Sequence, residues 1–340
     1  MNGAGLWLPA GGFLVGLAFG IVVQRQRFCL VAAVGNLAIM GDWRHLHAFL
    51  AAFAVAIAGT QWLEAGGWVT VADSAYRGAR LDWLGVGLGG LTFGFGATLA
   101  GGCAARTLVR SAEGNLGGWM ALLSFALAAY HAQFGFLSPA RTAISDATAV
   151  VLSSGDNSIA MLSGVSPAVA GIVAAIVCIV MLVVLGRGAH DRHLIASGAT
   201  IGALVVVAWW ITGNLAGDEF SPAPPSALNI SGPLARMVRY LLAGDGSPGF
   251  GIPFVLGTVV GAATSTIARG AFHWQWPPVR SIPNLLIGGM LMGIGAIVAG
   301  GCNIGQALSG VSTLSLGSLV AAGAMFSGVL LGVKWLERRS

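Results

Sequence analysis

Nine long apolar runs constrain this chain more than any other feature. A helix needs about 20 mostly apolar residues to cross the roughly 30 Å hydrocarbon core of a bilayer. Hydrophobic residues make up 56% of the 340 residues and charged residues only 9%, whereas soluble domains carry about 25% charged residues. The sequence therefore predicts an all-α integral membrane protein with about nine transmembrane helices. The runs lie near residues 6–24, 46–65, 84–101, 116–136, 166–186, 194–213, 249–268, 283–300 and 316–336.

The remaining stretches predict the topology. Residues 137–165 and 214–248 are too polar and too rich in proline for lipid, so we expect polar outer loops there. With the N-terminus outside, 12 of the 17 Lys and Arg residues fall on the inner side. Cytoplasmic loops carry this excess, which predicts a cytoplasmic C-terminus. The net charge of +5 thus indicates membrane orientation rather than nucleic-acid binding.

An internal repeat divides the chain. Residues 89–103 (GGLTFGFGATLAGGC) match residues 288–302 (GGMLMGIGAIVAGGC) at nine of fifteen positions, and both copies end in Gly-Gly-Cys. In the nine-span topology the two copies run in opposite directions, which is typical of inverted-repeat transporters. We expect one transmembrane domain over 1–340. Its halves would be about 1–136 and 166–340, with short broken or re-entrant helices where the glycines interrupt the spans.

The repeated Gly-Gly-Cys breaks are the candidate substrate site. At a broken helix the free N–H groups of the next segment face the gap, so two such breaks favour a bound anion without a buried cation. Two polar residues after the second break add possible donors. The predicted contacts are Gly101, Gly102, Cys103, Gly300, Gly301, Cys302, Asn303 and Gln306.

The chemistry of the thiols narrows the type of anion. A neutral thiol is a weak donor and its sulfur a weak, polarisable acceptor, which suits a soft, sulfur-containing anion that must move on. A third thiol, Cys29, follows Arg25 and Arg27 on the expected cytoplasmic side. The four cysteines form no C-x-x-C pair and no set with His at zinc spacing, so we expect no metal, no cofactor and no catalytic residues.

Two other functions remain open from the residues alone. A thiolate could attack a sulfane sulfur and become a persulfide, which would make the chain a membrane sulfurtransferase. Alternatively, the protein could be a general anion or water channel whose thiols are incidental.

Three segments resemble the YeeE/YedE-like sulfur transport family of bacterial inner-membrane proteins. They are QRQRFCL at 24–30, GGCAARTLVRSAEGNLGG at 101–118 and GGCNIGQALSGVSTLSLGSL at 301–320. The resemblance implies an hourglass of two inverted halves that takes up thiosulfate into the cytoplasm. It also implies a relay of transient hydrogen bonds through Cys302, Cys103 and Cys29.

The resemblance extends to partners and to one departure. Relatives are often accompanied by a cytoplasmic sulfur-carrier protein of the TusA type, and some are linked to selenium, so a selenium compound is an alternative substrate. Ala and Arg follow Cys103 where the family pattern is rich in Ser and Gly. We expect Arg106 to influence selectivity or release.

Overall fold

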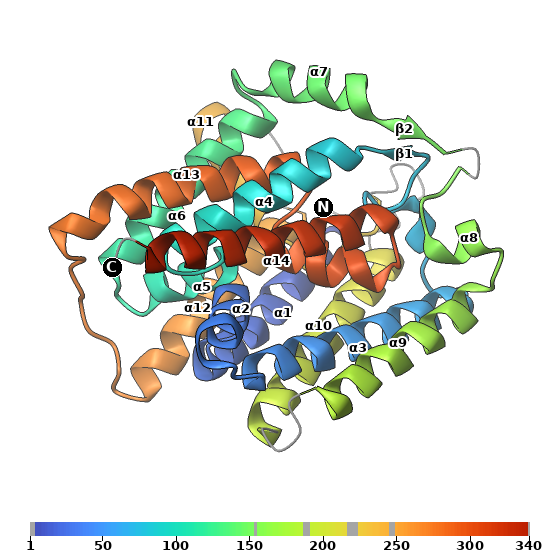
Figure 1. The fold of residues 1–340 in the computed structure, drawn as a ribbon, viewed down its shortest axis with the longest axis horizontal. Coiled ribbons are helices and arrows are strands. Elements are labelled where there is room, and N and C mark those ends of the chain that lie inside the picture. Colours follow the sequence, from blue (N-terminus) through green and yellow to red (C-terminus); the bar gives the residue numbers. More distant parts are fainter. Residues whose placement is uncertain (1–3, 153–154, 186–190, 216–223, 245–248, 339–340) are drawn as a thin grey trace.

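The protein folds as a bundle of long helices (Figure 1). The structure, a computed structural model, describes residues 4–152, 155–185, 191–215, 224–244 and 249–338. Among these residues, eight helices or joined helix groups are long and apolar enough to cross a membrane. The count rises to nine when α6 (Leu116–Gln133) and α7 (Ser138–Thr148), bent by 60°, form one span. The predicted all-α integral membrane fold, with about nine spans, is confirmed.

The other elements follow in chain order. The long helices are α1 (Ala4–Gln26), α3 (Arg44–Ala65), α4 (Trp83–Leu99), α9 (Pro167–Val184), α10 (Arg192–Leu215), α12 (Gly251–Ala268), α13 (Ile282–Val298) and α14 (Leu316–Glu337). The short elements are α2 (Leu30–Met40), α5 (Ala104–Ala112), α8 (Ile159–Ser163), α11 (Ser231–Ala243), the 3₁₀ turns η1 (Val71–Asp73) and η2 (Val279–Ser281), the π-helix η3 (Asn303–Gly310), and the antiparallel strands β1 (Arg80–Leu81) and β2 (Val150–Val151).

Glycines let helices from the two halves of the sequence pack closely. The pairs are α1 with α12, α3 with α10, α4 with α14, and α6 with α13. At Gly16, a Cβ atom would lie 2.1 Å from the carbonyl oxygen of Phe254, and at Gly261 it would lie 2.1 Å from that of Leu17. No larger residue fits at these crossings. The small-residue packing expected of membrane helices therefore fixes which helices are neighbours.

Helix α9 presents an exposed apolar surface. Its mean hydropathy is 2.9, and only a small share of it is buried inside the protein. Large apolar side chains such as Ile172, Ile176 and Val180 are more than half exposed. Cys178, the fourth cysteine, lies half-buried on this helix against the neighbouring core. The exposed apolar face fits contact with a lipid bilayer.

The expected outer loop over 214–248 contains a short helix. Its described part contains α11, whose first five residues are buried together with Leu228 and Ile230. Only this first part of α11 is enclosed by protein. A helix of 13 residues does not need a 20-residue apolar run, so its sequence resembles that of an external loop. The stretch 137–165 contains α7, β2 and α8, and α7 buries no residue.

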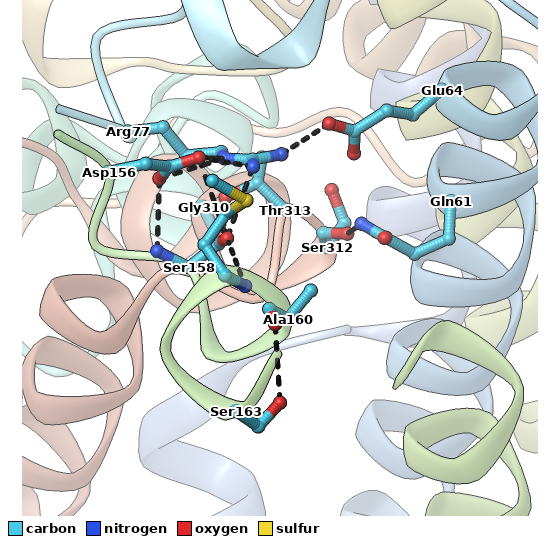
Figure 2. Close-up of polar contacts among 11 residues, drawn as sticks. Gln61, Glu64, Arg77, Asp156, Ser158, Ala160, Ser163, Gly310, Ser312 and Thr313 are labelled. Carbon is cyan, nitrogen blue, oxygen red and sulfur yellow. Dashed lines mark hydrogen bonds and ion pairs between the residues drawn. The ribbon is translucent and has the colours of Figure 1, made fainter. Parts of the chain in front are cut away.

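A buried ion cluster ties connecting segments to the bundle near the end of η3 (Figure 2). Arg77, whose side chain is 4% exposed, forms ion pairs with Glu64 of α3 and with Asp156 before α8. On the same helix as Glu64, Gln61 donates a 3.1 Å hydrogen bond to the carbonyl oxygen of Ser312. The cluster therefore fixes the segments between α3 and α4, and before α8, against the second Gly-Gly-Cys region.

Candidate functional site

The two Gly-Gly-Cys turns have the same backbone geometry. Gly101 and Gly300 adopt left-handed conformations, with φ of 72° and 77°, directly after α4 and α13. Cys103 and Cys302 then take extended conformations and serve as the N-caps of α5 and η3. Both cysteines are 0% exposed. Each thiol is thus held inside the protein beside the first N–H groups of a short helix, where the backbone favours negative charge.

A long polar side chain braces each turn. On the first turn, Arg110 donates 3.2 Å hydrogen bonds to the carbonyl oxygens of Ala100 and Gly101. On the second turn, Gln306 donates a 2.8 Å bond to the carbonyl oxygen of Ala299. The Gln306 carboxamide oxygen also accepts a 2.6 Å bond from a hydroxyl group of α14. The brace satisfies carbonyl groups left free at the end of the long helix, but it is cationic only in the first half.

Cys29 lies against the first turn. It is the N-cap of α2, and its thiol lies close to the Cys103 thiol. Backbone N–H groups of Val31 and Ala32 also face the Cys29 sulfur, and that of Arg106 faces the Cys103 sulfur. The structure brings these two predicted thiols together, between two helix N-termini that supply donors to an anion.

Asn229 occupies the matching place beside the second turn. It lies just before α11, and the Cys302 thiol donates to its Oδ1 atom over 3.9 Å. Both pairs therefore join a Gly-Gly-Cys thiol to the start of another short helix. Two thiols form the first pair, whereas a thiol and a carboxamide form the second.

The second turn contains one extra residue. Cys103 and Cys302 are 199 positions apart, whereas the N-caps Asn115 and Ser315 of the following helices are 200 apart. The insertion is absorbed by the π-helical winding of η3. Single π-turns inside α-helices are rare and concentrate at functional sites. The winding thus marks the second turn as the more specialised of the two.

Asn303, the first residue of η3, is a buried polar group without a partner. It is 0% exposed, and among the described residues neither Oδ1 nor Nδ2 of its side chain makes a hydrogen bond. Leaving a buried carboxamide unsatisfied costs about 1–3 kcal/mol for each polar atom, so such a group needs a reason. A polar ligand beside Cys302 would satisfy both atoms.

Cavities approach the thiols from opposite ends of the bundle. We call the end bearing Arg27, Arg106 and Arg110 the basic face, and the other end, bearing Tyr76, the opposite face. A cavity of about 640 Å³ on the basic face reaches Cys29, Gly101, Arg27, Arg106 and Arg110. A second basic-face cavity of about 250 Å³ is lined by residues including Gln24, Arg25, Arg27, Arg106, Glu113 and Arg269. One of about 320 Å³ on the opposite face reaches Tyr76, Asn229, Arg236 and Gly300.

The structure places the predicted site residues in three groups. Cys29 and Gly101 line the basic-face cavity, and Gly300 lines the opposite one. The remaining residues lie in the turns or in η3, and they are buried. They are Gly102, Cys103, Gly301, Cys302, Asn303 and Gln306. Among the described residues, no group of His, Cys, Asp and Glu is placed to hold a metal ion, and the four cysteines are free.

Sequence reasoning missed Arg110, Asn229 and Arg236, and it predicted Gln306 as a substrate contact rather than as a brace. Arg110 and Gln306 brace equivalent carbonyl groups from different sequence positions, seven and four residues after their cysteines, so the repeat does not reveal the shared role. Asn229 and Arg236 lie in a stretch interpreted as a loop. The only signal for Asn229 is its place just before a short helix, as Cys29 stands just before α2.

Comparison with known proteins gives consistent matches. Residues 25–331 match the family model described as sulphur transport. The thiosulfate transporter TsuA of Escherichia coli is 30% identical over 320 residues, covering 87% of this chain and 86% of the relative. TsuA of Spirochaeta thermophila is 31% identical over 323 residues, covering 90% and 92%. The probable transporter YedE of Salmonella typhimurium matches only 109 residues, at 32% identity. On this basis, the chain belongs to the sulphur transport family of membrane proteins.

Proposed function

We propose that this protein carries thiosulfate inward across the bacterial cytoplasmic membrane. The observation that carries the proposal is the pair of matched Gly-Gly-Cys turns, whose thiols are buried while Gly101 of the first turn lines a basic-face cavity and Gly300 of the second lines the opposite-face cavity. The two similar full-length relatives are named thiosulfate transporters, which supports the same substrate. Thiosulfate combines a soft terminal sulfur with sulfonate oxygens, and the site offers both soft thiols and hard N–H donors.

The proposed path runs from Cys302 through Cys103 to Cys29. The ion enters the opposite-face cavity, loses water beside Cys302, and is stabilised by thiols and by N–H groups of the helix N-termini. Asn303 supplies further donors between the turns, and the close Cys29–Cys103 pair delivers the ion to the basic-face cavity. Each contact is weak, which suits transport because a deep binding well would trap the ion.

The proposed orientation places the basic face in the cytoplasm. Five arginines line its two cavities: Arg25, Arg27, Arg106, Arg110 and Arg269. The positive-inside rule assigns such an end to the cytoplasm, which puts the N-terminus outside and the C-terminus inside. Helices α4 and α13 pack antiparallel: Gly89 near the start of α4 contacts Ala299 at the end of α13, and Gly96 near the end of α4 contacts Gly288 near the start of α13. This arrangement supports two inverted halves.

A cytoplasmic sulfur-carrier protein of the TusA type is the proposed recipient of the substrate's sulfur. The basic-face cavities open where such a protein would approach, and their arginines would favour an acidic docking surface. The carrier, rather than this chain, would then perform the sulfur-transfer chemistry.

Uptake by purified protein in proteoliposomes tests the proposal. Wild-type protein should accumulate labelled thiosulfate faster than sulfate or selenite, with no increase in water flux. Thiosulfate entry no faster than in protein-free vesicles would refute the function. Cys29→Ser and Cys103→Ser separate a hydrogen-bond relay from a sulfurtransferase, because a hydroxyl group donates hydrogen bonds but forms no persulfide. Partial uptake by both variants supports the relay, and complete loss in either supports covalent transfer.

A further inference from the structure

Asn229 stands where the second half of the chain repeats the arrangement around Cys29. In the first half, α1 is followed by Cys29, the short helix α2 and the long helix α3. In the second half, α10 is followed by Asn229, the short helix α11 and the long helix α12. Each of these residues contacts the thiol of its own Gly-Gly-Cys turn. Cys29 thus has a counterpart, and the counterpart is an amide.

Hydrogen bonds fix the orientation of the Asn229 carboxamide. Its Oδ1 atom accepts 3.1 Å bonds from both the backbone N–H and the hydroxyl group of Ser231, and it also faces the Cys302 thiol. Oδ1 is therefore fully used by the protein. Among the described residues Nδ2 donates no hydrogen bond, and Asn229 lines the 320 Å³ cavity of the opposite face. Two N–H donors are left for a ligand.

The described lining of the same cavity offers donors and no acidic group. Tyr76 is buried with its ring edge against Trp209, 6.1 Å between centroids, and its hydroxyl group makes no hydrogen bond among the described residues. Arg236 contributes a guanidinium group to the lining. None of the described lining residues is Asp or Glu. Amide, phenol and guanidinium donors without a carboxylate fit an anion with several oxygens.

Space beside the carboxamide is kept open by a glycine. At Gly305 of η3, a Cβ atom would lie 2.9 Å from both Cγ and Oδ1 of Asn229. The corresponding position in the first half, three residues after Cys103, is Arg106. At this position the second turn thus has a glycine that leaves room for the Asn229 amide, whereas the first turn has an arginine that lines the basic-face cavities.

We infer that Asn229 is a substrate-positioning residue of the opposite face. Its Nδ2 group donates to the sulfonate oxygens of the ion, while the Cys302 thiol meets the soft terminal sulfur. This inference rests on the proposed function and deepens it. The entry site contacts both the sulfonate oxygens and the terminal sulfur of the substrate, whereas the two thiols of Cys29 and Cys103 both contact the terminal sulfur. An amide is a stronger hydrogen-bond donor than a thiol, so the entry site binds the sulfonate oxygens more strongly than the thiol pair does.

Kinetics of thiosulfate uptake by three Asn229 variants in proteoliposomes test the inference. Asn229→Ala should raise KM about tenfold with Vmax within about twofold, the loss expected for one hydrogen bond to a charged group. Asn229→Asp is the decisive variant, because a carboxylate retains the acceptor for Ser231 but replaces the free donors with negative charge. It should raise KM more than Ala does. Asn229→Cys, which copies the first half, should lie between wild type and Ala.

The control and the contrary results are distinct. Asn214→Ala changes an exposed asparagine at the end of α10, bonded to Trp68 and outside the cavity, and should retain wild-type KM. Wild-type KM in Asn229→Asp and Asn229→Cys would show that Asn229 only caps α11, and would overturn the inference while leaving the proposed function intact. Absence of thiosulfate uptake by the wild-type protein would overturn both. Circular dichroism and gel filtration confirm that each variant is folded.

Discussion

The two Gly-Gly-Cys turns share a backbone but differ in the side chains around it. Both place a buried cysteine after a left-handed glycine and before a short helix. Around the first turn, the brace is Arg110 and the facing residue is Cys29. Around the second, the brace is Gln306 and the facing residue is Asn229. The backbone thus supplies the same helix-terminus donors twice. Among the described residues, the side chains give the basic-face cavities five lining arginines, whereas the opposite-face cavity has one, Arg236, beside amide and phenol donors.

In the proposed function, the shared backbone would serve transport itself, and the differing side chains would set its direction and its selectivity. Under the same proposal, the duplicated backbone would provide weak anion sites inside the protein. Charge on the basic face would attract the ion toward that cavity, and the amide on the opposite face would select it on entry. Variants that disturb the shared backbone should therefore have larger effects than variants that disturb one side chain.

The largest effect is expected at the left-handed glycines, and it should be unequal. A Cβ atom at Gly300 would lie 2.7 Å from Nε2 of Gln306, whereas at Gly101 it would lie 3.2 Å from Nη1 of Arg110. Gly300→Ala should lower the initial rate of thiosulfate uptake at least tenfold, and Gly101→Ala less. Gly41→Ala is the matched control, because Gly41 is also left-handed (φ 65°) but has open space around it. Equal rates in all three variants would show that the braces do not matter.

Substitution of Asn303 should affect thermal stability and thiosulfate uptake in different ways. Asn303→Ala removes a buried carboxamide that lacks partners within the described protein, so the midpoint of thermal unfolding should stay level or rise by a few degrees. Uptake should nevertheless fall about tenfold, because the ion loses a donor beside Cys302. The first half has Ala104 at the equivalent position. A variant with both unchanged uptake and raised stability would mean that Asn303 does not meet the substrate.

Arg106 should have a moderate, salt-dependent effect. It forms a 3.0 Å ion pair with Glu113 and lines both basic-face cavities. Arg106→Ala should slow uptake about threefold at low ionic strength, and the difference should shrink at high salt as the charge is screened. Arg44→Ala, at an arginine that lines neither cavity, is the control. A loss of the same size at every salt concentration would argue for a packing role.

The ion cluster of Figure 2 should affect stability but not substrate handling. Burial disfavours the charged form of Asp156, but the hydrogen bonds from Arg77 outweigh it and lower the pKa of this carboxyl. A lowered pKa stabilises the fold above the unfolded value of about 3.9, and this contribution is lost as the pH falls through the folded value.

Asp156→Asn should therefore lower the midpoint of thermal unfolding by roughly 5 °C at pH 7, with KM unchanged. The gap between thermal scans of wild type and variant in detergent should narrow progressively below about pH 5 and close only below the lowered folded pKa of Asp156. A constant gap across this range would show that the charge of Asp156 is not what stabilises the cluster.

Much of the fold was predictable because a helix that spans the bilayer must be about 20 residues long and mostly apolar. Long apolar runs gave the spanning helices, and the repeated glycines before Cys103 and Cys302 marked the breaks. The short helix α11 was not predictable in this way, because its buried first part packs against protein and the helix carries no 20-residue apolar run. Asn229 escaped notice for the same reason. The roles of Arg110 and Gln306 depend on which carbonyl groups their side chains reach, and this requires the folded geometry.

The most direct test of the account compares single cysteine variants in one uptake assay. The initial rate of thiosulfate entry into proteoliposomes should fall at least tenfold in both Cys103→Ala and Cys302→Ala, since each turn supplies one buried thiol on the path. Cys178→Ala, at the half-buried cysteine of α9, should keep a rate within twofold of wild type. A near wild-type rate in either turn variant would contradict the claim that both matched turns carry the ion.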